Sequence, residues 1–151
     1  MSDTISNQEK QNAVPKKLHA IIEELQEAER EERMEYLIDF AMELPDLPER
    51  LHSERNQMEQ VHECQSPVHL ITELHDGKVK FFFDIPREAP TVRGYAAILV
   101  EGLEGATAEE VLSLPDDVYM QMNIQDIVTP QRIRGLHFLL LYMKRQVTKL
   151  L

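Results

Sequence analysis

The sequence predicts an α+β fold in which a small antiparallel β-sheet packs against α-helices. Helical spacing of apolar residues marks both ends of the chain, and alternation of apolar and polar residues marks residues 68–85 between them. Helices that flank a run of strands are typical of α+β proteins. The chain has 151 residues, the length of one domain, and contains no internal repeat.

Two helices are expected in the first third of the chain. Apolar residues recur at i, i+3, i+4 and i+7 over residues 18–25, and helical spacing resumes over residues 34–44. The charged segment 26–33 has no apolar stripe and predicts a break between them. Pro45 and Pro48 end the second helix, and residues 46–67 show no helical periodicity, so we expect a loop there with a short strand near residues 56–61.

A β-hairpin is predicted next. Residues 68–74 and 79–85 alternate between apolar and polar side chains. Asp76-Gly77 lies between them, and this dipeptide suits a type I′ turn because both central residues need a positive φ. Phe82 falls on the polar face of the second strand, so we expect a neighbouring element to cover part of that face.

Three helices are expected after the hairpin. Apolar spacing over residues 92–103 predicts an amphipathic helix whose stripe faces the core. Thr107 and Glu110 form a capping-box pattern that opens a short helix. Thr129-Pro130 combines an N-cap residue with proline at the first helical position, and it begins a long terminal helix.

Composition and charge exclude several classes of protein. The formal net charge is −11, so the chain repels phosphate on average and nucleic acid is not an expected partner. No apolar run approaches the roughly 20 residues that span a bilayer, and the N-terminus lacks the apolar region of a secretory signal. We therefore expect a cytoplasmic protein with no membrane partner. Residues 1–14 are polar and aperiodic, which predicts a disordered tail ahead of a folded domain at 15–151.

The end of the chain is basic although the whole is acidic. No Asp or Glu follows Asp126, whereas five Lys or Arg residues do. These cations are interpreted either as ordinary surface that complements the helix dipole or as a docking surface for an acidic partner. The second interpretation describes an interaction module without chemistry of its own.

The single cysteine, Cys64, is the candidate for chemistry. One cysteine cannot form an intramolecular disulfide or supply the several thiolates of a zinc or iron–sulfur cage. Gln65, Ser66 and Pro67 follow it and favour a turn, so we expect the thiol on a loop rather than in the core. A loop thiol in the cytosol is prone to oxidation, which favours a use for it.

The residues alone leave other roles for this cysteine open. A hydrolase nucleophile would need a histidine base, and His62 is two positions away. A zinc site with His62, His69 and His75 is conceivable, although the spacing matches no common structural zinc pattern. A tucked loop cysteine without chemistry is the third interpretation.

Four short motifs occur in one order along residues 16–147. They are Leu44-Pro45 at a helix end, Cys64-Gln65-Ser66 ahead of a strand, Val92-Arg93-Gly94 at a helix start, and residues 129–136, which read Thr-Pro-Gln-Arg-Ile-Arg-Gly-Leu. In this order they resemble the SufE family, the sulfur-acceptor partners of cysteine desulfurases. The chain departs from the family at Glu63, where glycine is common, and at residues 67–69, where Pro-Val-His replaces Gln-Val-Trp.

This resemblance implies a SufE/IscU-like fold and a persulfide relay. Cys64 would take sulfur from a cysteine desulfurase, stimulate that enzyme, and pass the sulfur to an iron–sulfur scaffold complex. The protein would have no cofactor and no independent turnover. A scaffold role is excluded, because scaffolds need several cysteine ligands and this chain has one. Arg132 matches the family's arginine, so it is the candidate, with Arg93, to favour the thiolate or persulfide anion. Glu63 is expected to raise the thiol pKa.

Overall fold

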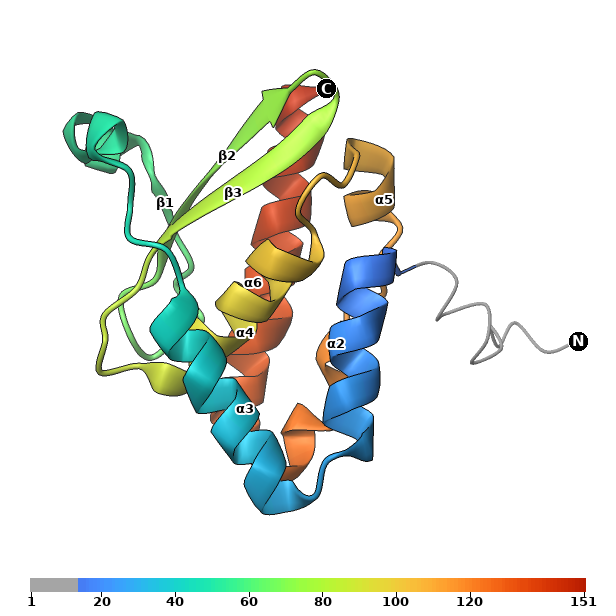
Figure 1. Cartoon of the computed structure of the whole chain (residues 1–151). Helices are drawn as coiled ribbons and strands as arrows, with labels where there is room; N and C mark the ends of the chain where they lie inside the picture. The colour runs from blue at the N-terminus through green and yellow to red at the C-terminus, as the bar shows by residue number, and fades with distance from the viewer. Residues whose placement is uncertain (1–13) are drawn as a thin grey trace, which may run out of the picture.

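The computed structural model describes residues 14–151, in which the α-helices lie on one side of a small sheet (Figure 1). The helices are α2 (Lys16–Glu27), α3 (Arg30–Glu43), α4 (Pro90–Gly102), α5 (Ala108–Leu112) and α6 (Pro130–Leu150), with 3₁₀ helices η1 (Glu49–Gln57), η2 (Val118–Met120) and η3 (Ile124–Asp126). The strands are β1 (Glu59–Gln60), β2 (His69–His75) and β3 (Lys78–Asp84). The predicted α+β class is confirmed. The predicted tail lies outside the described residues except for Val14, which is buried.

The predicted break between the first two helices is confirmed at Ala28 and Glu29. The guanidinium of Arg33 donates to the carbonyls of Leu25 at 3.0 Å and Ala28 at 2.7 Å, which satisfies the end of α2. Glu29 then begins α3 with a capping box. The buried side chain of Arg33, which belongs to α3, therefore caps the C-terminal end of α2.

The predicted hairpin is confirmed, with its turn. β2 pairs antiparallel with β3 from His69↔Asp84 to His75↔Lys78, and β1 adds a short third strand to the outer edge of β2. Asp76 and Gly77 have φ of 52° and 76°, the positive values that a type I′ turn requires.

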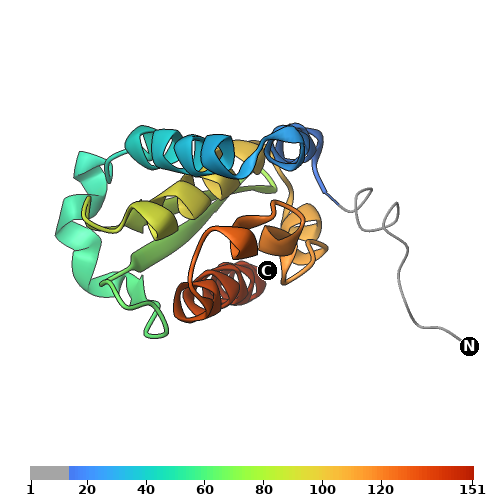
Figure 2. The ribbon, with the colours of Figure 1, turned by 90° about the horizontal axis from the view of Figure 1, so that it is seen from below.

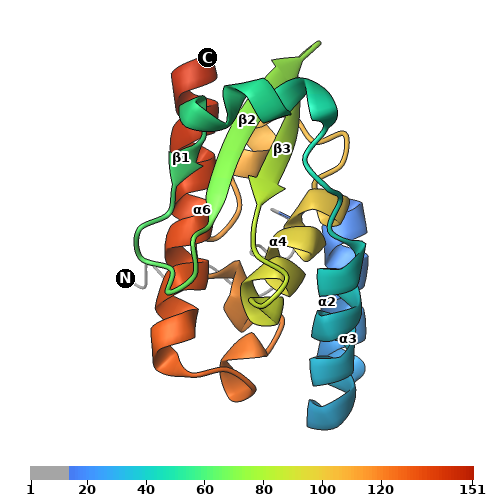
Figure 3. The same cartoon turned by 90° about the vertical axis from the view of Figure 1, so that its left-hand side faces the viewer.

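The expected loop over residues 46–67 was wrong in part, because η1 lies within it. This 3₁₀ helix crosses the outer face of the hairpin (Figure 3). Leu51 and its neighbours Leu47 and Met58 pack there against Ile71 and Phe82. The expectation that an element covers Phe82 is therefore confirmed. Sequence periodicity missed η1 because Leu51 is its one buried side chain, too few to mark a helical stripe.

Helix α4 forms the centre of the molecule. Helices α2 and α3 pack on one side of it and α6 lies on the other, with the sheet alongside (Figure 2). Residues 92–99 are all buried, so α4 is enclosed nearly all round there rather than along a single stripe. Gly94 makes the close packing possible, because a Cβ atom there would lie 2.3 Å from the carbonyl oxygen of Leu37 on α3.

The two predicted helix starts after α4 are also confirmed. The hydroxyl of Thr107 accepts from the backbone N–H of Glu110 at 3.2 Å, and that of Thr129 accepts from Arg132 at 3.4 Å. Within the described residues, no helix is long and apolar enough to cross a membrane.

Candidate functional site

Cys64 lies on the loop that joins β1 to β2. The backbone N–H of Val61 donates to the carbonyl of Val68 at 2.9 Å, which closes the base of this loop. Both valine side chains are fully buried. The N–H of Cys64 donates to the carbonyl of Val61 at 3.2 Å and shapes the turn that carries the thiol. The base of the loop is thus fixed in the core, while its tip lies at the surface.

The thiol rests against the first turns of α6. Cys64 is partly exposed, and its Sγ–H donates to the carbonyl of Gly135 at 3.6 Å. The prediction that Cys64 lies on a loop rather than in the core is confirmed.

Two side-chain contacts hold the loop to α6 on either side of the cysteine. The Tyr142 hydroxyl donates to Glu63 Oε1 at 2.8 Å, and Gln65 Nε2 donates to Gln131 Oε1 at 2.9 Å. The first bond joins a buried tyrosine to a charged carboxylate, so its loss costs more free energy than loss of the exposed bond between the two glutamines.

A small cavity of about 30 Å³ opens beside the thiol. Its lining comes from the loop and from the first turns of α4 and α6: Cys64, Gln65, Ser66, Ala89, Thr91, Val92, Gln131, Arg132, Gly135 and Leu136. Helix N-termini carry partial positive charge and unpaired N–H groups, so both helices direct positive potential towards this cavity.

A wider hollow of about 330 Å³ lies next to the cavity and shares Thr91 and Arg132 with it. Arg30 and Asp126 also line this hollow. Arg132 therefore borders both the thiol cavity and the wider hollow.

At rest the thiol is protonated. Burial raises the pKa of Cys64 to about 11, and the nearby Glu63 carboxylate acts in the same direction. The expectation that Glu63 raises this pKa is confirmed, although desolvation is the larger cause. The resting thiol is therefore a weak nucleophile at neutral pH.

The structure separates the two predicted arginines. Arg132 is exposed and lines the cavity, as its motif suggested. Arg93 is buried, and its guanidinium donates to the carbonyls of Ala41 at 3.2 Å and Ile85 at 2.6 Å. Arg93 thus ties the end of α3 to the end of the hairpin, which is a structural role. It does not line the cavity among the described residues.

The alternatives based on histidine find no support in the geometry. The cavity lining, all of it within the described residues, contains no histidine that would serve as a base for Cys64. In the part of the chain that the structure describes, no three His, Cys, Asp or Glu side chains converge as a metal site would require.

The basic end of the chain is partly used within the molecule. Lys144 pairs with Asp116 at 2.6 Å, and Arg145 pairs with Glu59 and lies over the ring of Tyr142 at 4.5 Å. These contacts attach α6 to the segment after α5 and to β1, which leaves fewer cations for an acidic partner.

Gly135 and Tyr142 belong to the site, but the sequence assigned neither to it, although Gly135 falls within the motif over residues 129–136. Gly135 carried a weak signal, since a glycine inside a predicted helix indicates a close approach by another group. Tyr142 carried none, because its partner Glu63 is far away in sequence.

The family model described as "Fe-S metabolism associated domain", SufE, matches residues 19–147. The chain belongs to the SufE family. A SufE-like protein of Mycobacterium tuberculosis, itself uncharacterized, is 35% identical over 89% of this chain and 94% of its own length. The sulfur acceptor protein CsdE of Escherichia coli is 31% identical over 72% of each chain. A solution structure of a hypothetical protein from Thermus thermophilus superposes with a TM-score of 0.80 at 38% identity, covering 90% of this SufE-family chain and 96% of that one.

Proposed function

We propose that this protein accepts sulfur from a cysteine desulfurase onto Cys64, stimulates that enzyme, and passes the sulfur to an iron–sulfur assembly scaffold. The observation that carries the proposal is the position of the single cysteine in a SufE-family chain. It lies partly exposed on a surface loop between the first turns of two helices. The likeness to a sulfur acceptor protein supports the same activity.

The transfer is a thiol–persulfide exchange. The thiolate of Cys64 attacks the outer sulfur of the desulfurase persulfide, so that a new S–S bond forms on Cys64 and the S–S bond on the desulfurase breaks. The desulfurase cysteine leaves as a thiolate and takes up a proton, while Cys64 gives its proton to solvent. One S–S bond replaces another, so no external oxidant or reductant is needed.

The resting contacts imply that the loop moves when the donor arrives. Burial and Glu63 keep the thiol protonated, and Gly135 covers one side of it. Release of the bonds from Tyr142 to Glu63 and from Gln65 to Gln131 would bring Sγ into water and lower its pKa. A thiol that is inert at rest and reactive only on the donor is protected from adventitious oxidation.

Arg132 is proposed to favour the anion during transfer. Its side chain lines both the thiol cavity and the adjoining hollow. A guanidinium within reach of a thiolate or persulfide stabilises the charged form. The first turns of α4 and α6 contribute in the same sense.

The decisive experiment is mass analysis of the protein after incubation with a desulfurase and free cysteine. We expect a gain of one or more sulfur atoms on the peptide that holds Cys64. Cys64→Ser should fold, gain no sulfur, and fail to stimulate the desulfurase. His62→Ala, a nearby exposed substitution, should retain both properties. Full stimulation by Cys64→Ser would refute the relay.

A further inference from the structure

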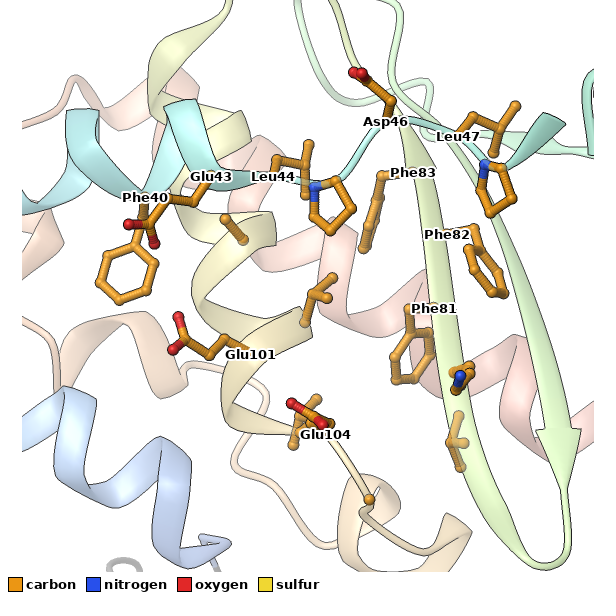
Figure 4. A pocket seen from close by; sticks show the side chains of 18 residues that line it. Phe40, Glu43, Leu44, Asp46, Leu47, Phe81, Phe82, Phe83, Glu101 and Glu104 are labelled. Atoms are coloured by element: carbon orange, nitrogen blue, oxygen red, sulfur yellow. The ribbon is translucent and has the colours of Figure 1, made fainter.

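A groove of about 530 Å³ lies away from the cysteine loop, between the end of α3, the segment that follows it, β3 and the last turns of α4 (Figure 4). Val92 lines the thiol cavity and Val100 lines the groove. At about 1.5 Å per residue, these positions are about 12 Å apart along α4. The groove is thus a separate surface from the sulfur-transfer site.

The groove has an apolar floor and an acidic rim. Phe40 on α3, Phe81 on β3 and Val100 on α4 contribute to the floor. Four carboxylates stand around it: Glu43, Asp46, Glu101 and Glu104. Figure 4 shows Glu101 on α4 and Glu104 just after the end of that helix. Lys80 is the one cation in this lining, all of which lies within the described residues.

The rim carboxylates are weakly neutralised. Asp46 reaches Arg87 at 3.8 Å and Glu104 reaches Lys17 at 3.6 Å, and these four side chains are 60% exposed or more. Such pairs contribute little. Glu43 and Glu101 form no ion pair within 4 Å among the described residues. The groove therefore presents apolar surface inside a negative field.

The face of α4 that lines the groove has helical regularity. Ala97, Val100 and Glu101 lie on one face of α4 at i, i+3 and i+4, and Glu104 follows in the turn after the helix. An amphipathic helix that lies in such a groove buries apolar anchors spaced at i, i+3, i+4 and i+7 of its own sequence.

We propose that the groove binds an amphipathic helix of a partner protein, with apolar side chains in the groove and Lys or Arg residues against the acidic rim. Charge complementarity selects this occupant. Residues 1–13 of the chain itself, MSDTISNQEKQNA, carry two acids and a single lysine, and they offer little apolar surface. The site is independent of the sulfur relay, because a helix bound there leaves the Cys64 loop uncovered.

The test uses the full chain and a synthetic amphipathic helix of leucine and lysine, titrated at low salt and mapped by amide chemical shifts. We expect saturable one-to-one binding, with shifts over residues 97–104 and none over residues 61–68. Replacing both Glu43 and Glu101 by Gln should weaken binding about tenfold, since two surface charge pairs are lost. Val100→Lys should abolish binding by placing a cation in the groove.

The matched control is Glu88→Gln with Glu109→Gln, which removes the same charge from exposed sites outside the groove. The proposal is overturned if this control weakens binding as much as the Glu43/Glu101 variant does. It is also overturned if a helix of leucine and glutamate binds as tightly as the helix of leucine and lysine. The proposal is also overturned if the chemical shift changes over residues 97–104 arise from self-association of the protein. The same holds if a variant that lacks residues 1–13 shows these changes when no peptide is added. Sulfur transfer to Cys64 in the Glu43/Glu101 variant reports separately on the relay.

Discussion

The thiol of Cys64 rests directly on the backbone of Gly135. Sγ lies 3.6 Å from the Gly135 carbonyl oxygen, and a Cβ atom on Gly135 would lie 3.1 Å from Sγ and 3.4 Å from the Cα of Cys64. Any larger residue at position 135 would therefore push the cysteine loop outward. Because position 135 on α6 has no side chain, the thiol of Cys64 can lie half-buried against this helix.

Gly135→Ala is expected to expose the thiol without unfolding the protein. The added methyl displaces Sγ by a few tenths of an ångström or more, because that contact is tighter than ordinary packing. Alanine also gains about 1 kcal/mol of helix propensity, which offsets the strain in the free energy of unfolding. Iodoacetamide should alkylate Cys64 several-fold faster in this variant at pH 8, with a melting temperature close to that of the wild type. Unchanged alkylation would show that the Gly135 contact does not shield the thiol.

The rate of Cys64 alkylation is expected to rise about tenfold per pH unit well beyond pH 9. An ordinary thiol has a pKa of about 8.5, so its alkylation rate levels off above that pH, whereas the pKa of Cys64 is raised to about 11. Because the folded pKa lies above the unfolded one, this group's contribution to stability is complete below pH 9 and is lost as the pH rises towards 11. The dependence of the alkylation rate on pH is measured by quenching the reaction at set times between pH 7 and pH 11 and analysing the products by mass spectrometry.

Glu63→Gln separates the two causes of that shift. Removing the carboxylate should lower the pKa of Cys64, but leave it above the ordinary value, because burial is the larger cause. Serine at position 66 gives a control, since Ser66→Ala changes no charge. A profile in Glu63→Gln identical to that of the wild type would contradict the role assigned to the carboxylate.

Arg132→Ala is expected to slow sulfur acceptance about tenfold while leaving stability nearly unchanged. The side chain is exposed, and only its backbone N–H takes part in the helix cap, so the fold does not depend on the guanidinium. Arg132→Lys should retain most of the rate because it keeps the positive charge. Arg134→Ala is the matched control, since that exposed side chain lies over the ring of Phe138. Unchanged transfer and unchanged Cys64 titration in Arg132→Ala would remove the proposed role.

Tyr95→Phe is expected to stabilise the protein by about 1 kcal/mol, because a buried hydroxyl without a partner costs free energy. The Tyr95 hydroxyl is buried and has no hydrogen-bond partner among the described residues. Its ring meets that of Tyr119 edge-on at 6.4 Å, a contact that phenylalanine keeps. Urea denaturation measures the change. Tyr119→Phe is the contrasting variant and should destabilise, since the Tyr119 hydroxyl lies 3.2 Å from His137 Nδ1. Destabilisation by Tyr95→Phe would show that the hydroxyl has a partner.

Features governed by neighbouring residues were predictable from the sequence. The turn at Asp76-Gly77 and the caps at Thr107 and Thr129 depend on residues within a few positions of each other, so local patterns contain the information. The loop position of Cys64 followed in the same way from Gln65, Ser66 and Pro67. These local signals, with the order of family motifs, were enough for the fold class and for the identity of the candidate nucleophile.

Only the tertiary structure decided the contacts between segments that are far apart in the sequence. Arg93 stands in a family motif, yet its carbonyl partners on α3 and after β3 make it a structural residue. Gly135 and Tyr142 joined the site because α6 packs beneath the cysteine loop. The pKa of Cys64 depends mainly on how much water that packing removes, and desolvation is a property of the assembled fold rather than of any run of residues. The sequence by itself therefore determined which atom is the candidate nucleophile, and the packing of α6 decided that it is protonated and sheltered at rest.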